Sequence, residues 1–425
     1  MKLIHTAKKA LYISVAKYFR YWSNKSLRRW NPRVIVVTGS VGKTTMLNLI
    51  ETQLGPAAHY SHNANSAFGI AFDIVGMRGI TSSKLKWLYL FIAVPLRSLF
   101  FTRHEKYYVA EIDGERPREA SLLAEWLRPE VTVWVSLGRS HAVFYDAVVA
   151  SGRYGSVDEA IADEFASLAR NTSKLVIVDG GNPAMTTQIK DISGKIVAIT
   201  DAALHKYHVS PTSASFVMSS GTFSFSDPMP KETYVQLAML EQLMNYLALP
   251  ITHDVSSFSS PPGRSRHFAG IKDTHLIDSS YNAHLISMRS MIAMMQAMPA
   301  THKWAVIGDM VEQGKSESEE HRLLGELLST TDFEQIILVG RRVSLHTHPA
   351  ISSSNPQRHV ESFANARDAL QYIVDHLQGN EVLLFKGSQY LEWIVEKLLL
   401  NPQDVSKLAR QDIASVKRRA SWGLS

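Results

Sequence analysis

The stretch VVTGSVGKTTMLNLIETQL, residues 36–54, decides the fold of this chain. Its first part is a short apolar run rich in β-branched residues, which favours a buried strand. After the turn Gly-Ser-Val-Gly-Lys-Thr-Thr, apolar residues recur at helical spacing, so we expect a helix over residues 43–54. A strand that passes through such a turn into a helix is typical of a phosphate-binding loop (P-loop).

The turn has the residue types that bind a nucleotide triphosphate. Gly39 and Gly42 let the backbone bend so that its N–H groups face an anion, and the positive end of the following helix adds to this. Lys43 can then reach the terminal phosphates, and the Thr44 hydroxyl can bind Mg²⁺. Val37 stands where the usual motif has its first glycine, and an ordinary strand-to-helix turn is the alternative. The residues predicted to bind the nucleotide here are Gly39, Ser40, Val41, Gly42, Lys43, Thr44 and Thr45.

The rest of the chain predicts an α/β protein of more than one domain. Its 425 residues exceed one ordinary core, and it has no cysteine, so disulfides and thiolate metal sites are excluded. Short apolar strands alternate with helices on both sides of SSFSSPPGRSR, residues 256–266, which predicts mostly parallel sheets and a hinge. Residues 206–226 are Ser/Thr-rich and alternating, which predicts an antiparallel edge. We expect a basic amphipathic helix over 1–33, a central P-loop ATP-binding domain over 34–258, and a Rossmann-like α/β domain over 259–425.

Several further motifs follow the P-loop in a fixed order. They are NANSAFG (63–69), AEIDGERPREASLLAEWLRPEVTVWVSLGRSH (110–141), PPGRSRHF (261–268), LIDSSYNAHLISMRSM (276–291), VIGDMVEQG (306–314) and LLFKGS (383–388). In this order the series resembles the Mur ligase family, from about residue 33 to about residue 400. The resemblance implies an ATP-dependent enzyme that phosphorylates a carboxylate and joins the resulting acyl phosphate to the amine of an amino acid or dipeptide.

The resemblance assigns roles to residues of the central domain. Lys43 and Gly42 match the residues that hold the β and γ phosphates, and Glu111 matches the family's magnesium-binding glutamate. His141 matches a histidine near a second metal, although a lone histidine is often structural. Asn63 and Asn65 match an Asn-rich loop near substrate and phosphates, and plain turn chemistry is the alternative for both.

The carboxyl half also has matching positions. Arg264 matches an arginine that reaches ATP across the domain cleft, and Asp278 matches an aspartate that binds the ribose. Tyr281 and Asn282 match an element at the nucleotide. A surface ion pair on a hinge is the alternative for Arg264 and Asp278.

The sequence departs from the family in three ways. Many members have a carbamylated lysine that binds metal, but GSVDEAIADEFASL (155–168) contains no lysine, so Glu164 or Asp163 would have to supply the carboxylate. The alternative is that both face solvent. His284 stands where the family has asparagine, which leaves the donor specificity open. The chain also shows no amino-terminal domain for a UDP-sugar, so the acceptor need not be a UDP-muramoyl peptide.

Two segments contain no acidic residue: 1–33, with nine Lys and Arg, and 74–104. Because both mix cationic and large apolar side chains, they predict a contact with the inner face of an anionic membrane. The alternative is that they pack on each other or form a dimer seam. We do not expect nucleic acid as a partner, because no reading module is present.

The expected function is therefore an ATP- and Mg²⁺-dependent carboxylate–amine ligase. Its partners would be a carboxylate acceptor of the cell envelope, or a related acceptor, and an amino acid or dipeptide donor. It would be cytoplasmic or peripheral on the inner membrane face. The rival hypothesis is a non-catalytic nucleotide-binding homologue that serves as an assembly partner.

Overall fold

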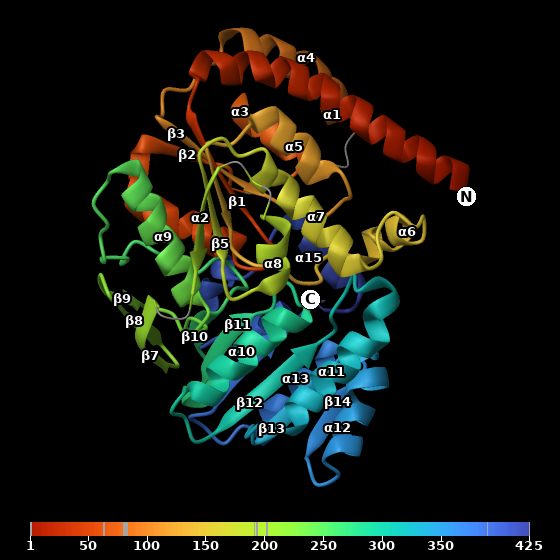
Figure 1. Ribbon diagram of the computed structural model, residues 1–425. Helices are drawn as coiled ribbons and strands as arrows, with labels where there is room; N and C mark the ends of the chain where they lie inside the picture. Colours follow the sequence, from red (N-terminus) through yellow and green to blue (C-terminus); the bar gives the residue numbers. More distant parts are fainter. Residues whose placement is uncertain are drawn as a thin grey trace. The chain divides into compact units, whose positions relative to one another are not determined.

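The computed structural model describes residues 2–62, 64–79, 84–190, 192, 194–200, 203–388 and 390–424, with side chains from residue 12 onward in the first helix and from residue 85 in the helix Lys84–Phe100. The chain forms two compact units (Figure 1). Unit 1 consists of Met1–Gly138, Val148–Thr200 and Met239–Ile251, and unit 2 consists of Arg139–Ala147, Asp201–Ala238 and Thr252–Ser425. The predicted bounds 34–258 and 259–425 stay a prediction, because compact units need not match the domains of a family.

Unit 1 is built on a six-stranded sheet in the order β2-β3-β1-β4-β5-β6, and every neighbouring pair is parallel. Strands β1, β3 and β4 are almost wholly buried, as expected for a parallel sheet with both faces covered. This confirms the predicted α/β class. The strands are β1 (Arg33–Thr38), β2 (Ala58–Tyr60), β3 (Tyr107–Ile112), β4 (Val131–Trp134), β5 (Leu175–Asp179) and β6 (Lys195–Ile199).

Two helices of unit 1 fall where the sequence predicts them. The expected helix 43–54 is observed as α2, and the basic helix expected over 1–33 is observed as α1. The helices up to α9 are α1 (Lys2–Trp30), α2 (Lys43–Leu54), α3 (Ala67–Ile74), α4 (Lys84–Phe100), α5 (Glu119–Leu127), α6 (Asp146–Val149), α7 (Val157–Arg170), α8 (Pro183–Gln188) and α9 (Thr233–Leu247).

The basic N-terminal helix α1 packs on α3 and α4 (red and orange in Figure 1). The fully buried ring of Phe19 lies 4.8 Å from the ring of Phe72 and 5.0 Å from that of Phe91, measured between centroids. The Tyr18 hydroxyl donates to the carbonyl of Phe91 at 2.8 Å, and the Ser23 hydroxyl donates to a carbonyl of α3. The first helix is therefore part of the hydrophobic core of unit 1, and the alternative that the two basic segments pack on each other is correct for their inner faces.

Unit 2 contains a second six-stranded sheet in the order β10-β11-β15-β12-β13-β14. Strand β10 is antiparallel to β11 and the other pairs are parallel. The strands are β10 (Arg266–Ala269), β11 (His275–Ser279), β12 (Lys303–Gly308), β13 (Gln335–Val339), β14 (Val360–Phe363) and β15 (Val382–Lys386). The helices are α10 (Leu285–Ala297), α11 (Glu317–Ser329), α12 (His348–Ser354), α13 (Ala366–His376), α14 (Leu391–Leu398) and α15 (Ile413–Ser421).

The Ser/Thr-rich segment forms a separate sheet. Strands β7 (Leu204–Ser210), β8 (Ser213–Met218) and β9 (Gly221–Phe225) pair antiparallel in sequence order. The prediction of antiparallel strands is confirmed, but their placement as an edge of the parallel sheet is wrong. Short turns join the three strands, so each strand pairs with its neighbour in the chain and none of them extends the parallel sheet.

No helix in the described ranges is long and apolar enough to cross a membrane.

Candidate active site

The P-loop joins β1 to α2, and its two glycines have positive φ angles, which L side chains rarely adopt. Gly39 has φ 136° and Gly42 has φ 86°. A Cβ atom on Gly39 would lie 2.7 Å from the carbonyl oxygen of Ser136, so the loop is also sterically closed to a side chain there. The helix α2 begins at Lys43 directly after Gly42, which puts its unpaired N–H groups at the loop.

Two serine hydroxyls fix the loop to the segment after β4. The Ser40 hydroxyl donates to the carbonyl of Gly138 at 2.7 Å and accepts from the N–H of that residue at 2.9 Å. The Ser136 hydroxyl accepts from the N–H of Val41 at 2.8 Å and donates to its carbonyl at 2.7 Å. Because each hydroxyl makes two bonds to backbone, the loop is held in shape before any nucleotide binds.

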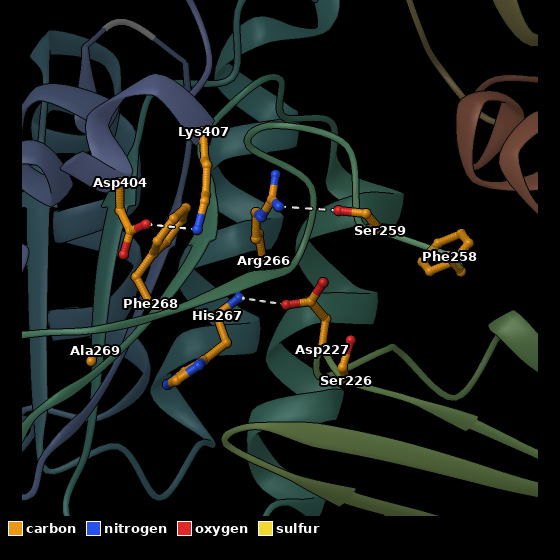
Figure 2. Close-up of a pocket in the computed structure, with 10 residues that line it drawn as sticks. All are labelled: Ser226, Asp227, Phe258, Ser259, Arg266, His267, Phe268, Ala269, Asp404 and Lys407. Atoms are coloured by element: carbon orange, nitrogen blue, oxygen red, sulfur yellow. Dashed lines mark hydrogen bonds and ion pairs between the residues drawn. The ribbon is translucent and has the colours of Figure 1, made fainter. Parts of the chain in front are cut away.

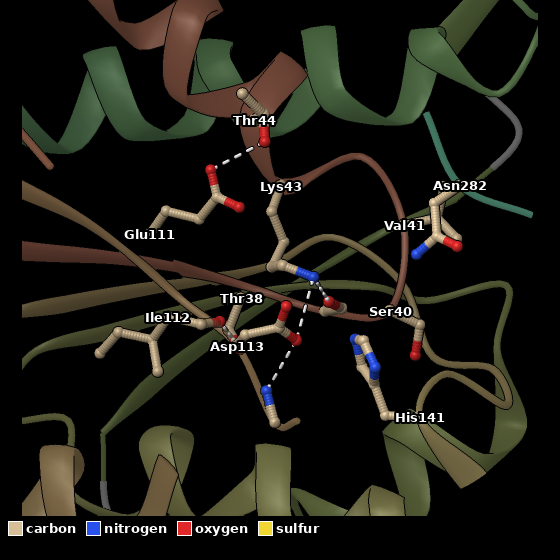
Figure 3. Close-up of polar contacts among 12 residues, drawn as sticks. Thr38, Ser40, Val41, Lys43, Thr44, Glu111, Ile112, Asp113, His141 and Asn282 are labelled. Atoms are coloured by element: carbon tan, nitrogen blue, oxygen red, sulfur yellow. Dashed lines mark hydrogen bonds and ion pairs between the residues drawn. The ribbon is translucent and has the colours of Figure 1, made fainter. Parts of the chain in front are cut away.

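Lys43 is buried at the base of the loop (Figure 3). Its ammonium group donates to the carbonyl of Gly39 at 2.6 Å and lies 3.3 Å from Oδ1 of Asp113. Asp113 follows β3 at the carboxyl edge of the parallel sheet. An ammonium group this deeply buried needs such partners, and a bound triphosphate would offer it stronger ones.

Thr44 and Glu111 form the second contact at the loop. The Thr44 hydroxyl donates to Oε2 of Glu111 at 2.9 Å, and the backbone N–H of Glu111 is fixed by the hydroxyl of Ser61. Both oxygens are hard ligands of the kind that Mg²⁺ takes, and Mg²⁺ typically needs only one or two protein carboxylates beside phosphate oxygens and water. The pair therefore fits a magnesium ion shared with a nucleotide. No cluster of three or more His, Asp or Glu side chains suited to a metal is found among the described residues.

His141 belongs to unit 2 and has a carboxylate neighbour there. Its Nδ1 lies 2.6 Å from Oε2 of Glu312, and its ring centroid lies 6.0 Å from that of His284. His141 has φ 56° at the start of a short turn of 3₁₀ helix, Ala142–Phe144. The pair with Glu312 fixes the ring orientation. The proposed metal role of His141 stays a prediction.

Arg264 lies in a tight turn before β10. Its guanidinium carbon is 4.9 Å from the ring centroid of Tyr281, and that of Arg410 is 5.3 Å from the same ring. Gly263, with φ 69°, accepts a hydrogen bond from the N–H of Tyr281, which ties the turn to the end of β11. Tyr281 is 44% exposed, so two cations and a partly accessible aromatic residue lie together, a combination suited to a base or a phosphate.

A buried polar cluster lies beneath this surface. Asp278 is the next-to-last residue of β11; its Oδ1 accepts from the N–H of Ser280 at 3.0 Å, and its Oδ2 finds no hydrogen-bond partner among the described residues. Burial raises the pKa of the Asp278 carboxyl. Lys386, which ends β15, donates to the carbonyls of Ser279 and Asn282. Burial and the nearby Arg264 lower the pKa of the Lys386 ammonium to about 7.

His284 caps the first turn of α10, and side-chain amides hold both of its ring nitrogens. The amide of Asn282 lies 3.2 Å from Nε2, and the amide of Gln313 lies 3.2 Å from Nδ1. The ring is buried, with 4% of its surface exposed. The replacement of the family's asparagine by His284 is therefore accommodated by a specific polar pocket.

The candidate replacements for the carbamylated lysine have structural partners. Glu164 accepts from the backbone N–H groups of Arg118, Ala120 and Ser121 and so caps the start of α5. Asp163 pairs with Arg170 at 2.6 Å and accepts from the Tyr154 hydroxyl. Neither carboxylate simply faces solvent, and a metal role for either stays a prediction.

Of the Asn-rich loop, Asn63 lies outside the described residues. The carbonyl of Asn65 accepts from the N–H of Asp113 at 3.2 Å, which links this loop to the partner of Lys43. The role of both asparagines toward substrate stays a prediction.

The structure thus brings predicted residues together in two groups. The first, which we call the P-loop group, lies in unit 1 and contains Lys43, Thr44 and Glu111. The second lies in unit 2 and contains Arg264, Asp278, Tyr281, Asn282 and His284. Sequence reasoning missed Asp113 and Lys386 as members of these groups. For both, the available signal was a charged residue at or just after the carboxyl end of a predicted parallel strand, where ligands of open α/β sheets bind.

A cavity of about 340 Å³ lies in unit 2 and is lined by other residues (Figure 2). The N–H of His267 donates to Oδ1 of Asp227 at 3.0 Å, and Arg266 donates to the Ser259 hydroxyl at 3.0 Å. Burial and the neighbouring His275 lower the pKa of the His267 imidazole. None of the predicted site residues lines this cavity.

Known proteins match both the sequence and the fold. Residues 263–389 match the family described as Mur ligase, glutamate ligase domain. The UDP-N-acetylmuramoyl-tripeptide–D-alanyl-D-alanine ligase of Buchnera aphidicola is 22% identical over 390 residues, and the match covers 88% of this chain and 78% of that protein. MurF of Acinetobacter baumannii has a TM-score of 0.70 at 20% identity, covering 91% of this chain and 80% of its own. MurF of Thermotoga maritima, in complex with ADP, has a TM-score of 0.68 at 17% identity, covering 95% and 84%.

The fold, the P-loop group and these matches define the class of the protein, and the prediction of an enzyme of the ligase class is confirmed. The predicted resemblance to the Mur ligase family is also confirmed. The chain is similar to the ligases named for UDP-N-acetylmuramoyl-tripeptide and D-alanyl-D-alanine.

Proposed function

We propose that the protein is an ATP-dependent carboxylate–amine ligase that adds an amino acid or dipeptide to a carboxylate of a cell-envelope or related acceptor. The observation that carries this proposal is the P-loop group, in which a buried Lys43 and the pair Thr44–Glu111 surround the start of α2. The relatives act on UDP-N-acetylmuramoyl-tripeptide and D-alanyl-D-alanine according to their names, so this pair is the first acceptor and donor to test. We propose the cytoplasm as the site of the reaction.

The reaction would proceed through an acyl phosphate. A carboxylate oxygen of the acceptor attacks the γ-phosphorus of ATP, and the bond to ADP breaks. The donor amine then attacks the acyl carbon, the carbon–oxygen bond to phosphate breaks, and amide, inorganic phosphate and one proton are released. Both steps bring anions together, so the main requirement on the protein is to neutralise and orient them.

The described residues can meet this requirement. The Lys43 ammonium would exchange the Gly39 carbonyl and the Asp113 carboxylate for phosphate oxygens, and the N–H groups at the start of α2 would face the same oxygens. Thr44 and Glu111 would hold Mg²⁺, which would neutralise charge that develops on the phosphates. Arg264 and Tyr281 would contact the nucleotide, as the resemblance implies, with Asp278 and Lys386 positioning the strand ends beneath them.

The rival proposal is a non-catalytic homologue that binds nucleotide and serves as an assembly partner. It gains support from the absence of lysine in residues 155–168. The simultaneous presence of Lys43, Glu111 and Arg264 favours the enzyme, because a protein that only binds nucleotide would not need the complete set.

Phosphate release would decide between the two. Purified protein is incubated with ATP and Mg²⁺ and with pairs of acceptor and amine, starting with UDP-N-acetylmuramoyl-tripeptide and D-alanyl-D-alanine. The ligase releases phosphate, with ADP as co-product, only when both members of a productive pair are present. Nucleotide binding with no phosphate release from any envelope-derived carboxylate and amine would favour the assembly partner.

The control variants come from unit 1. Lys43→Ala should abolish phosphate release, while Lys195→Ala, at an exposed position on β6, should leave it unchanged. Undiminished turnover in Lys43→Ala would refute the role assigned to this residue.

A further inference from the structure

Helix α4 exposes a continuous apolar stripe, which we call the outer face of α4. Its members recur at spacings of three and four residues, so they lie on one side of the helix. They are large: Leu85 is 80% exposed and Phe100 is 83% exposed. The outer face consists of Leu85, Leu88, Tyr89, Ile92, Leu96, Leu99 and Phe100.

The opposite side of α4 is apolar as well. Leu90 and Val94 are fully buried in the core of unit 1, and Trp87 and Phe91 pack against that core. A helix at the surface of a protein in water normally has a polar outer side. Because α4 lacks one, its outer face is a contiguous patch of the kind that marks an interaction site.

The charges around this face are of one sign. Lys86 and Arg97 lie within α4 and are exposed, and Arg29 of α1 donates to the carbonyl of Ser98. Lys17 and Arg28 are further exposed cations of α1. The segments 1–33 and 74–104 contain no Asp or Glu at all. An apolar face on a helix that, like the adjoining α1, carries only cations is complementary to a surface that is apolar inside and anionic at its border.

The geometry also suits such a surface. With 17 residues α4 is about 25 Å long, and its inner side is packed on α1 and the core along that length. The helix can therefore meet a partner only with its outer face, and its axis then lies parallel to the partner's surface. A second copy of the chain would bring the same cations face to face, which opposes that pairing by like-charge repulsion.

We propose that the outer face of α4 binds an anionic phospholipid membrane, with its apolar side chains in the interface between headgroups and acyl chains and the cations of α1 and α4 at the phosphates. Amphipathic helices bind membranes in this manner, and the binding weakens as salt screens the charges. The proposal does not depend on the ligase activity, since it concerns a surface of unit 1 that contains no predicted site residue.

Vesicle co-sedimentation of the full chain tests the proposal. Phosphatidylcholine vesicles containing phosphatidylglycerol should pellet the protein at low salt, and high salt should reduce the bound fraction. Vesicles of pure phosphatidylcholine should bind it much more weakly. A protein that stays in the supernatant with the anionic vesicles at low salt overturns the proposal.

Matched variants locate the binding surface. Leu88→Gln/Ile92→Gln/Leu96→Gln should lower the partition coefficient about 1,000-fold, since each of the three aliphatic side chains transferred from water contributes roughly tenfold. The control Leu345→Gln/Leu400→Gln/Ile413→Gln removes exposed apolar side chains outside α4 and should bind as the wild type does. Thermal melting confirms that both variants are folded.

Two results would contradict the proposal. Equal binding by the wild type and the α4 variant would place the membrane contact elsewhere. The second result has two parts: the wild type does not bind vesicles, and light scattering shows that it is a dimer while the α4 variant is a monomer. This result would assign the outer face of α4 to a second copy of the chain. Phosphate release measured without vesicles reports the ligase separately, so failure of one proposal is distinguishable from failure of the other.

Discussion

The Thr44 hydroxyl donates to Oε2 of Glu111 at 2.9 Å, so a residue of the P-loop and a residue of the neighbouring strand β3 meet at the start of α2. In the parallel register of β1 and β3, Glu111 lies beside Val37, which precedes the first glycine of the loop by two residues. A hydroxyl and a carboxylate placed together in this way fit a magnesium ion shared with a nucleotide.

Glu111→Gln should therefore impair the use of magnesium. The substitution keeps the size of the side chain and removes its charge, so we expect kcat to fall about 100-fold and the Mg²⁺ concentration for half-maximal rate to rise. Steady-state phosphate release as a function of Mg²⁺ measures both. The control is Thr52→Ala on the same helix. The Thr52 hydroxyl donates to the carbonyl of Leu49 and accepts from the side-chain amide of Gln53. An unchanged magnesium dependence in Glu111→Gln would show that this carboxylate is not a ligand.

Arg264→Ala should reduce turnover more than nucleotide affinity. Its guanidinium lies over Tyr281 and would stabilise charge that develops on the transferred phosphoryl group, so kcat should fall at least about tenfold while the Kd for ATP changes less. Calorimetry measures Kd, and phosphate release measures kcat. Arg266→Ala, two residues along and bonded to the Ser259 hydroxyl, is the control. A loss confined to ATP affinity would refute a transition-state role for Arg264.

Glu164→Ala separates a structural role from a metal role. The carboxylate accepts three backbone N–H groups at the start of α5, so its removal should lower the free energy of unfolding by about 1 to 3 kcal/mol. If the role is structural, activity measured well below the melting temperature should stay near that of the wild type. A large loss of activity with little change in stability would instead support replacement of the carbamylated lysine. Asp163→Asn, at a half-exposed ion pair, is expected to change stability by less than about 1 kcal/mol.

Lys386 should make stability depend on pH. Its pKa is about 7 in the folded chain, against an ordinary value of 10.5, so the unfolded chain binds the extra proton first. The contribution to stability is fully present above about pH 10 and is lost as the pH falls toward 7. We compare the free energy of unfolding of the wild type with that of Lys386→Met, which cannot titrate at this position. As the pH falls from about 10 to about 7, the wild type should lose roughly 1 to 4 kcal/mol relative to the variant. Urea unfolding at several pH values measures it, and a constant difference between the two proteins would contradict the lowered pKa.

Much of this architecture could be predicted from local sequence patterns. The P-loop, helix α2 and most strands of the two six-stranded sheets follow from glycine positions and apolar periodicity, which act over a few residues. The short strands β2, β10 and β14 were not predicted. The pairing of Lys43 with Asp113 could not be predicted, because it depends on which strands become neighbours across long connections. The same holds for the role of Glu164, since a carboxylate that caps another helix leaves no local signal. For α4 the sequence predicted an unusual apolar segment, but only the packing of Phe19 on Phe91 shows which face is buried.

The central claim is that ATP activates a carboxylate through an acyl phosphate, and transfer of oxygen tests it most directly. An acceptor that supports turnover is labelled with ¹⁸O in the reacting carboxylate, and the inorganic phosphate released during amide formation is analysed by mass spectrometry. The account predicts that each phosphate carries one ¹⁸O atom from the acceptor. Amide formation with unlabelled phosphate, or with AMP and pyrophosphate as products, would contradict it.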